Sequence, residues 1–468
     1  MLFKYFFLFS RLLIQLFNIY LKYYFKLEIT DKNINTTINL IKCNGALCIK
    51  IIQWLISRNE INEYQLINHF SKFSCFLENC KIHSFEYTLS LLKNDQVIVF
   101  NSIHPIASGS IAQVYDCTYK GKRVALKVKH PEIDEQIYFP KIFIKLVVFF
   151  MNICNIHIPI EINDFFKIFY NQLNFNLEVE NLISFKHNFK NNSLIVIPEY
   201  MYHTDGYIIM SYEDGSCIEN IYKDNNVTSM TRYKIIFTLY AFILQCYLID
   251  GIIHCDLHSG NWKVKIKDND YKLVIYDFGV VTRITNVGIM QEISYLFMTN
   301  CLFYDKDKFF NLFINNEFIK NGDIDKNKIC DLLLNSEVGK ILKRPMNISL
   351  YFLEMCKIFK KDNIHFQTNF LLIILGISLI EKHLIEYSHY GENRIYTNFE
   401  PENKISNMDI LFYNETMEKI NFFNTIDNFH ELSRLFSNLL QRYKTEKGIK
   451  SFLDIKKENN KIIKFLPI

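Results

Sequence analysis

The chain contains 468 residues, of which 49% are hydrophobic and 15% aromatic, so it has enough apolar side chains for a large core and too many for a disordered protein. Lys and Arg number 53 against 49 Asp and Glu, and the net charge of +4 is too balanced to indicate a nucleic-acid-binding protein. The 12 cysteines form no C-x-x-C pair and no Cys/His cluster at zinc spacing, which predicts free thiols and argues against a zinc site.

The opening segment, residues 1–30, predicts an amphipathic helix. At about 100° per residue its polar side chains fall within an arc of roughly 80°, and the rest of the helix surface is nearly all Phe, Leu, Ile and Tyr. The polar residues of this arc are Lys4, Arg11, Gln15, Asn18, Lys22 and Lys26. Because no acidic residue precedes Glu28, the pattern favours a helix that lies in a membrane interface with its basic side chains toward anionic headgroups. A membrane-spanning helix, a mitochondrial transit peptide and a helix packed on the body of the protein are the alternatives.

Residues 31–95 predict a helical extension, and residues 96–213 predict a small β-rich lobe. Within that lobe, QVYDCTYK and RVALKVK are two β-rich runs joined at Lys120-Gly121-Lys122, which predicts a β-hairpin. The hairpin is preceded by A-x-G-x-x-A, the spacing of a kinase glycine-rich loop, whose backbone N–H groups approach nucleotide phosphates. The residues of this alanine-rich loop are Ala107, Ser108, Gly109, Ser110, Ile111 and Ala112. Alanine restricts the backbone more than glycine does, so we expect a stiffer loop than in ordinary kinases.

Lys127 lies in the V-A-L-K of the second strand, where a kinase lysine neutralises the nucleotide phosphates. A lysine that protects an edge strand from aggregation is the alternative. Asn163-Asp164 predict the start of a helix that runs to about His187 and carries Glu178. We expect Glu178 to form an ion pair with Lys127, because a desolvated lysine needs an opposite charge to stay ionised.

The strand-like runs SLIVIPEYM and GYIIMSYEDG lead to the expected crossing between two lobes at Asp214-Gly215. A kinase-like lobe crossing contacts the adenine of the nucleotide. The predicted adenine contacts are therefore Met210, Ser211 and Tyr212.

Residues 214–387 predict a helical second lobe. RYKIIFTLYAFILQCYLIDG predicts a helix that ends at Gly251, and VKIKDNDYKLVIYDFG predicts a short hairpin. The apolar run 370–380 is shorter than the roughly 20 residues that cross a bilayer, so it predicts a buried helix. Residues 388–468 predict a loop-rich insertion followed by a last amphipathic helix, FHELSRLFSNLLQRYK.

Two motifs carry the chemistry of the second lobe: HCDLHSGNW, which starts at His254, and YDFGVV. An Asp, an Asn five positions later and then D-F-G is the order found in phosphoryl-transfer enzymes. Asp256 is predicted to orient or deprotonate an accepting hydroxyl or water. Asn261 and Asp277 are predicted to hold Mg²⁺, which prefers oxygen ligands. His254 is predicted to brace the loop through backbone hydrogen bonds rather than to act as a base.

PIASGSIAQVY, VALKVKHP, HCDLHSGN and YDFGVVTR resemble the UbiB family of atypical kinases, the aarF-domain-containing kinase-like proteins, and the resemblance extends over about residues 45–384. It implies a protein-kinase-like bilobal α+β fold, ATP binding with Mg²⁺, and a role in coenzyme Q or other isoprenoid-quinone lipid metabolism at membranes. Choline and aminoglycoside kinases share H-x-D-L-H-x-G-N but not the alanine-rich loop.

Two further segments resemble the family in altered form. NGALCIKIIQWLISR resembles the K-x-G-Q segment, with Lys50 and Gln53 kept and isoleucine in place of the glycine. QLNFNLEVEN resembles E-L-D-F-x-x-E-A-x-N and keeps Glu178, but Gln172 and Asn174 replace the two acids. In the family those acids face the lysine, so the resemblance implies that Lys50 has lost its expected ion partner. The alternative is that both segments are amphipathic helices with surface charges.

Three functions follow from these patterns: an ATP-using atypical kinase or ATPase acting on or for membrane lipids, a nucleotide-binding pseudokinase that serves as a lipid-handling scaffold, and a small-molecule kinase of the choline type. The phosphate acceptor is left open between protein, lipid and water. The expected cofactors are ATP and Mg²⁺. The expected partners are membrane lipids or isoprenoid-quinone intermediates and quinone-biosynthesis proteins, with no nucleic acid. The expected location is a membrane, mitochondrial in a eukaryote.

Overall fold

The computed structural model describes a two-lobed body and the helices that precede it. The described residues are 2–56, 80–92, 98–153, 162–267, 270–298, 319–320, 365–367, 369–370, 372–374, 376, 416–417, 419–423 and 429–446. The mixture of helices and sheets confirms the predicted α+β class. Most of the predicted loop-rich insertion and part of the run 370–380 lie outside the described residues, although Phe370, Leu372 and Ile373 are buried.

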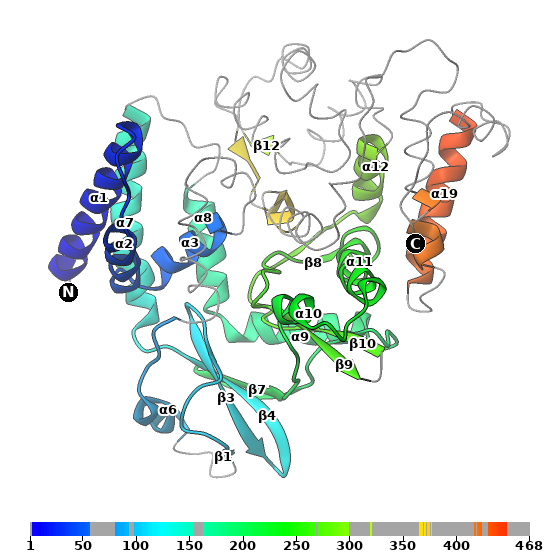
Figure 1. Cartoon of the computed structure of the whole chain (residues 1–468), viewed down its shortest axis with the longest axis horizontal. Coiled ribbons are helices and arrows are strands. Elements are labelled where there is room, and N and C mark those ends of the chain that lie inside the picture. The colour runs from blue at the N-terminus through cyan, green and yellow to red at the C-terminus, as the bar shows by residue number, and fades with distance from the viewer. Residues whose placement is uncertain are drawn as a thin grey trace.

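A six-stranded antiparallel sheet forms the first lobe (Figure 1). Its strands are β1 (Ile98–Phe100), β2 (Ala107–Ser108), β3 (Ala112–Tyr119), β4 (Lys122–Lys129), β6 (Tyr200–His203) and β7 (Tyr207–Ser211). The strand order is β1-β3-β4-β7-β6, with β2 paired to β3. The predicted hairpin of β3 and β4 is present, and its turn residues Lys120 and Gly121 adopt φ of 49° and 76°, the left-handed conformation of a tight hairpin turn.

Alternating side chains of the hairpin form the core of this lobe. Val124, Leu126 and Val128 are fully buried on one face of the sheet. Helix α6 (Phe85–Leu91) covers that face with an aromatic ring that packs on the sheet. Because successive residues of a strand point to opposite faces, Lys127 projects from the other face, toward the second lobe.

Two helices follow instead of the single helix predicted from Asn163 to His187. They are α8 (Ile162–Gln172) and α9 (Phe175–Asn188). Asn174 separates them, because its side-chain oxygen accepts hydrogen bonds from the first backbone amides of α9 and so starts a new helix. The prediction of one helix was therefore wrong, and the break places Glu178 in the first turn of α9.

The second lobe is built around a buried helix. It contains α10 (Ile218–Lys223), α11 (Ser229–Gln245), a π-helical turn (Cys246–Asp250), α12 (Val287–Met298) and α19 (His430–Glu446). As predicted, the long helix ends at Gly251, whose φ of 64° terminates it. The segment Ser229–Asp250 is the one helix in the described ranges that is long and apolar enough to cross a bilayer, with a mean hydropathy of 1.3. Its most apolar stretch is 61% buried inside the protein, as expected of a core helix.

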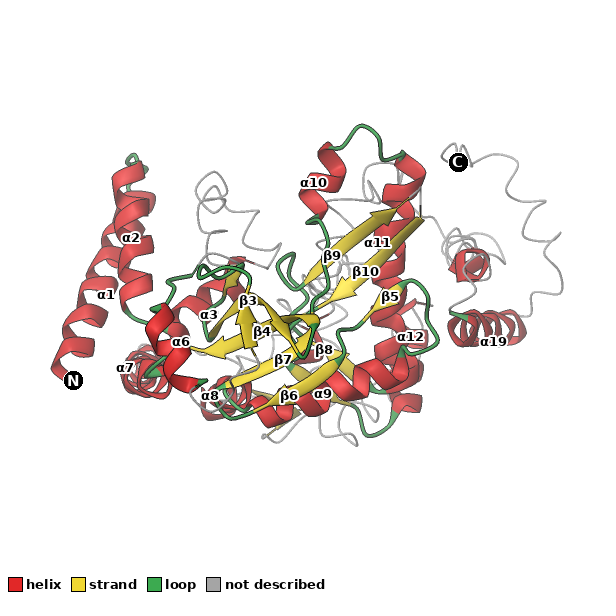
Figure 2. Ribbon diagram, turned by 90° about the horizontal axis from the view of Figure 1, so that it is seen from below, coloured by secondary structure: helices red, strands yellow, loops and turns green. Residues whose placement is uncertain are grey.

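Short strands at the lobe junction carry the two motifs. They are β5 (Ile195–Val196), β8 (Ile252–His254), β9 (Trp262–Lys267), β10 (Asp270–Ile275) and β11 (Val281–Arg283), and β12 (Ile319–Lys320) pairs with β13 (His365–Phe366) elsewhere. The predicted hairpin is present as β9 and β10, and β5 lies parallel to β10 in a sheet beside that of the first lobe (Figure 2). HCDLHSGNW begins at the last residue of β8, and D-F-G follows β10. The two motifs therefore lie side by side at the lobe junction.

The helices at the N-terminus pack together with α7 (Ile133–Ile153), which comes later in the sequence (Figure 1). They are α1 (Leu2–Tyr24), α2 (Asp31–Cys43) and α3 (Ala46–Ile56). Tyr5, Phe9 and Leu12 of α1 are buried against α2 and α7. Gln15 and Lys22 donate hydrogen bonds to Asn33 of α2. The expectation that the basic side chains of this helix face headgroups is therefore wrong for Lys22, which contacts α2.

Candidate active site

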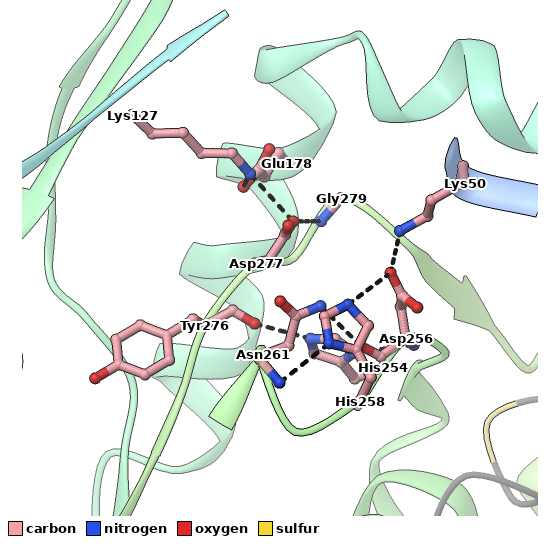
Figure 3. Close-up of polar contacts among 11 residues, drawn as sticks. Lys50, Lys127, Glu178, His254, Asp256, His258, Asn261, Tyr276, Asp277 and Gly279 are labelled. Carbon is pink, nitrogen blue, oxygen red and sulfur yellow. Dashed lines mark hydrogen bonds and ion pairs between the residues drawn. The ribbon is translucent and has the colours of Figure 1, made fainter. Parts of the chain in front are cut away.

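Lys127 lies between two carboxylates at the lobe junction (Figure 3). Its Nζ is 2.5 Å from Glu178 Oε1 and 3.1 Å from Asp277 Oδ1. The lysine lies on β4, and the glutamate lies in the first turn of α9. The aspartate is the second residue after β10. The predicted ion pair between Lys127 and Glu178 is present, and the D-F-G aspartate completes it.

The charges of Lys127, Glu178 and Asp277, which form an ionic triad, shift one another's pKa. Burial by itself lowers the pKa of Lys127, but the carboxylates of Asp277 and Glu178 outweigh burial and raise it, so the ammonium stays charged. Burial also opposes the charge of Asp277, yet Lys127 and Lys50 hold its pKa below the ordinary range. Burial raises the pKa of Glu178 to about 7, with the nearby Asp277 carboxylate acting in the same direction. Asp277 is therefore the ionised carboxylate at neutral pH, and Glu178 is the one that titrates.

Asp277 is held in an unusual backbone conformation. Its φ is 54°, a left-handed value that is uncommon outside glycine. The backbone N–H of Gly279 donates to Asp277 Oδ1 at 3.2 Å, and Asn181 Nδ2 donates to the carbonyl of Phe278 at 3.1 Å. These bonds fix the D-F-G segment on α9 and aim the carboxylate at the lobe junction.

The loop after β8, which carries Asp256 and Asn261, is braced by His254, as predicted. His254 Nε2 lies 3.0 Å from the carbonyl of Tyr276, and its Nδ1 accepts the backbone N–H of Asp256 at 3.3 Å. A carbonyl only accepts, so the ring is a neutral tautomer with its hydrogen on Nε2. Burial lowers the pKa of His254, which agrees with a neutral ring.

Asn261 and Asp277 fit the requirements of Mg²⁺. The side-chain Nδ2 of Asn261 donates to the carbonyl of Asp256 at 2.8 Å, which leaves Asn261 Oδ1 directed away from that carbonyl (Figure 3). The backbone carbonyl of Asn261 accepts the N–H of Tyr276 at 2.8 Å, so the asparagine is tied to the residue before Asp277. An amide oxygen and an ionised carboxylate are hard ligands, and nucleotide phosphates and waters would complete the shell. The described residues contain no group of three or more His, Cys, Asp or Glu that would form a metal site by itself.

Asp256 is not free to face an acceptor, contrary to the sequence expectation. Its Oδ2 forms an ion pair with Lys50 Nζ, and His258 Nε2 lies 3.9 Å from the same oxygen. Burial opposes the charge of Asp256, but the ammonium of Lys50 lowers its pKa. Burial lowers the pKa of His258, so this histidine is neutral. The side chain of Asp256 is 4% exposed and has Lys50 as its counter-ion.

The lysine and glutamine of the altered K-x-G-Q segment do not lie on the surface. Lys50 and Gln53 of α3 are 6% and 2% exposed, which contradicts the surface-charge alternative. Lys50 has also gained a partner in Asp256, so the loss of the two acids has not left it unpaired. Gln172, in the first acid position, is 4% exposed, and its Nε2 has no hydrogen-bond partner in the described part of the chain. Asn174, in the second acid position, caps α9 and takes no part in the ion pairs.

The predicted adenine contacts lie on β7 and just after it. Met210 packs on the cluster formed by α9 and the start of β3, below the alanine-rich loop. Tyr212 follows the strand and is covered by the Arg123 guanidinium, 3.8 Å from the ring centroid. The sequence did not indicate Tyr276, whose hydroxyl donates to the carbonyl of Glu213 at 2.8 Å and so joins the lobe crossing to the D-F-G segment. Its place directly before Asp277 was the only signal available.

Comparisons with known proteins find kinase-like relatives. Residues 93–311 match the ABC1 atypical kinase-like domain. The chain is 32% identical over 246 residues to the probable serine/threonine-protein kinase abkC of Dictyostelium discoideum, covering 49% of this chain and 34% of that protein. It is 27% identical to the mitochondrial ABC1 family protein YPL109C of Saccharomyces cerevisiae (53% and 43% covered) and 26% identical to the probable protein kinase UbiB of Shewanella halifaxensis (43% and 38% covered).

The chain carries an ABC1 atypical kinase-like domain and is similar to proteins named UbiB and ABC1, and its two-lobed structure is the kinase-like fold of that domain. It spans less than half of the length of these three relatives. Among solved structures, the Rv3197–erythromycin complex from Mycobacterium tuberculosis is 18% identical with a TM-score of 0.42, covering 65% of this chain and 83% of that one.

Proposed function

We propose that this protein is an atypical kinase or ATPase that uses Mg-ATP in membrane lipid or isoprenoid-quinone metabolism. The observation that carries the proposal is the position of Lys127 between Glu178 and Asp277. A lysine held by a helix carboxylate and beside the D-F-G aspartate is the arrangement that protein kinases require for phosphoryl transfer. The quinone-lipid role rests on the family, through the UbiB-named relative.

In this proposal each residue has a separate task. Asn261 and Asp277 would hold Mg²⁺, which neutralises charge on the phosphates when bound. Lys127 would bind the α- and β-phosphates, and Glu178 would hold the lysine in place. Asp256 would orient the accepting hydroxyl or water once Lys50 has left it.

The test is ATP turnover by the purified full chain, measured with and without anionic liposomes. We expect Mg²⁺-dependent turnover that Asp277→Asn abolishes while the protein stays folded. Asp205→Asn, an exposed carboxylate in the β6–β7 turn, is the matched control and should leave turnover unchanged. Equal turnover in wild type and Asp277→Asn would contradict the proposal.

A second candidate function is a nucleotide-binding pseudokinase that serves as a scaffold. The observation that favours it is the ion pair of Lys50 with Asp256, which neutralises the carboxylate expected to face the acceptor. ATP turnover by the Lys50→Met variant distinguishes the enzyme from the scaffold. An enzyme restrained by Lys50 should turn over ATP faster in this variant, whereas a scaffold should bind nucleotide without turnover in both forms.

We also propose that α1 binds a membrane surface. Its outward face is apolar, with exposed residues that include Phe3, Phe6, Phe7, Ile14, Phe17, Tyr20 and Tyr24. Exposed apolar surface of this extent marks an interaction site. The neighbouring Arg11 is exposed and suits anionic headgroups. A mitochondrial location is proposed by analogy with the S. cerevisiae relative.

A further inference from the structure

The segment from Cys80 to Leu92, which precedes the first strand, lies along the edge of the alanine-rich loop. The backbone N–H of Cys80 donates to the carbonyl of Ser108 at 2.8 Å. The N–H of His83 donates to Gln113 Oε1 at 2.9 Å, and Gln113 Nε2 donates back to the carbonyl of His83 at 3.3 Å. The segment is therefore hydrogen-bonded to both ends of the loop.

Two histidines connect this segment to the centre of the loop. His83 Nδ1 lies 2.8 Å from His130 Nδ1, and His130 Nε2 lies 3.1 Å from the carbonyl oxygen of Gly109. Because a carbonyl only accepts, His130 Nε2 carries the hydrogen. Burial lowers the pKa of His130, and in the neutral ring Nδ1 accepts from His83 Nδ1, which defines the tautomers of both histidines.

On its other side, His83 is joined to a chain of hydrogen bonds that runs through Thr88 and Tyr115 to Gln113. Thr88 Oγ1 lies 2.9 Å from His83 Nε2 and 3.1 Å from the hydroxyl of Tyr115, and that hydroxyl accepts from Gln113 Nε2 at 2.5 Å. Since His83 Nε2 must accept, the Thr88 hydroxyl donates to it and the Tyr115 hydroxyl donates to Thr88. Gln113, Tyr115 and Thr88 are fully buried, so water does not compete for these bonds.

Fixing the Gly109 carbonyl also fixes the next amide. A trans peptide is planar, so its C=O and N–H point in opposite directions, and the N–H of Ser110 points away from His130. The Gly109 N–H is used within the loop by the carbonyl of Ala112 at 2.9 Å, whereas no described residue accepts a hydrogen bond from the Ser110 N–H. A carbonyl repels a phosphate and an N–H attracts it, so the orientation of this peptide matters for an anion.

We propose that the segment 80–92 positions the alanine-rich loop, with His83 as a positioning residue that acts through His130 on the Gly109 peptide. The loop orientation itself is independent of any activity. Its consequence, that the Ser110 N–H is held ready for a nucleotide phosphate, rests on the proposed function.

The surroundings of the two histidines favour their neutral forms. Burial, and then the neighbouring His130, lower the pKa of His83 to about 4, and burial lowers the pKa of His130. The Tyr87 ring packs on His83, while the charged Lys81 and Glu86 of the same segment are exposed. Lys129, next to His130, directs its ammonium to the carbonyl of Leu173. The neutral chain of bonds should be complete above about pH 6.5 and weaken as the pH falls toward 4, because acid protonates an acceptor nitrogen.

The test is hydrogen–deuterium exchange of the full chain, read on peptides that cover residues 107–112. His83→Leu removes both the donor and the acceptor, His83→Asn keeps a donor at the Nδ1 position, and His104→Leu changes an exposed histidine of the same lobe as a control. We expect exchange of the loop amides to rise about tenfold in His83→Leu, the factor for one lost hydrogen bond. It should stay near wild type in His83→Asn and in the control. An unchanged loop in His83→Leu, or faster exchange across the whole lobe in both His83 variants, would overturn the proposal.

Two further measurements separate this inference from the proposed function. Exchange of the wild-type loop, corrected for intrinsic rates, should increase between pH 7 and pH 5, and His83→Leu should show no such increase. A pH-independent wild-type loop would overturn the role of the histidines. Mg-ATP affinity should then fall in His83→Leu and recover in His83→Asn. If wild type binds no Mg-ATP, the proposed function fails while the exchange result still decides the positioning role.

Discussion

Lys50 and Asp256 are 206 positions apart in the sequence and form a buried ion pair between α3 and the loop after β8 (Figure 3). Their side chains are 7% and 4% exposed. The pair connects the N-terminal helices to the residue that would face a phosphate acceptor. The ion pairs of Lys127 with Glu178 and Asp277 are formed at the same time, and the charge of Lys50 also helps to lower the pKa of Asp277.

The first prediction concerns the strength of this pair. Lys50→Met should lower the free energy of unfolding by about 3–5 kcal/mol, because it leaves the Asp256 carboxylate buried without a counter-ion. Urea unfolding of the full chain measures the change. The double variant Lys50→Met/Asp256→Asn removes both charges and should be more stable than the sum of the single variants predicts. Strictly additive losses would show that the two residues do not interact.

A second prediction concerns Lys127. Lys127→Met should destabilise the protein at pH 8, where two carboxylates then lie close together without their ammonium. At pH 5 the loss should be smaller, since Glu178, whose pKa burial raises to about 7, takes up a proton. Thermal unfolding at both pH values checks this difference. Lys122→Met, at the exposed start of β4, is the control and should change stability little at either pH.

The third prediction is a pH dependence that originates in Glu178. Its folded-state pKa of about 7 lies above the ordinary value of 4.5, so its contribution to stability is largest below 4.5 and is lost as the pH rises through 7. Ionised Glu178 holds Lys127, so kcat/KM for ATP should rise with a midpoint near pH 7. Glu178→Gln should remove this rise. A profile that keeps the same midpoint in Glu178→Gln would assign it to another group.

A fourth prediction tests the membrane-binding face of α1. Replacing the exposed Ile14 and Phe17 by serine should weaken co-sedimentation with anionic liposomes by about tenfold per residue, the effect of losing one buried apolar side chain. Asn18→Ser, on the same helix, should have little effect. Deleting residues 1–27 should abolish binding. If the deleted protein co-sediments as well as the full chain, the membrane contact lies elsewhere.

The sequence predicted the parts of the site that local patterns encode. The alternation of the β3–β4 hairpin places Lys127 on the face opposite the core, and the D-F-G motif places Asp277 at the end of a strand. The Lys127–Glu178 pair could be predicted because Lys127 lies in the V-A-L-K strand and Glu178 on a predicted helix. A desolvated lysine needs such an opposite charge to stay ionised.

Contacts that depend on tertiary packing could not be predicted in this way. The pairing of Lys50 with Asp256 is set by the position of α3 over the second lobe, and no pattern in either segment indicates it. The break between α8 and α9 was missed although Asn174 is a good helix N-cap, because the hydrophobic pattern continues through it. Gln15 and Lys22 face α2, since a helix in a folded protein uses part of its polar arc for hydrogen bonds.

We propose that Asn261, Asp277 and Lys127 form a site for a magnesium nucleotide, and calorimetric titration of the full chain with ATP measures this binding. We expect binding in the presence of Mg²⁺ that is lost in EDTA and is at least about tenfold weaker in Asp277→Asn, while Asp205→Asn binds as wild type does. Binding of equal strength in Mg²⁺ and EDTA, or in wild type and Asp277→Asn, would contradict the account.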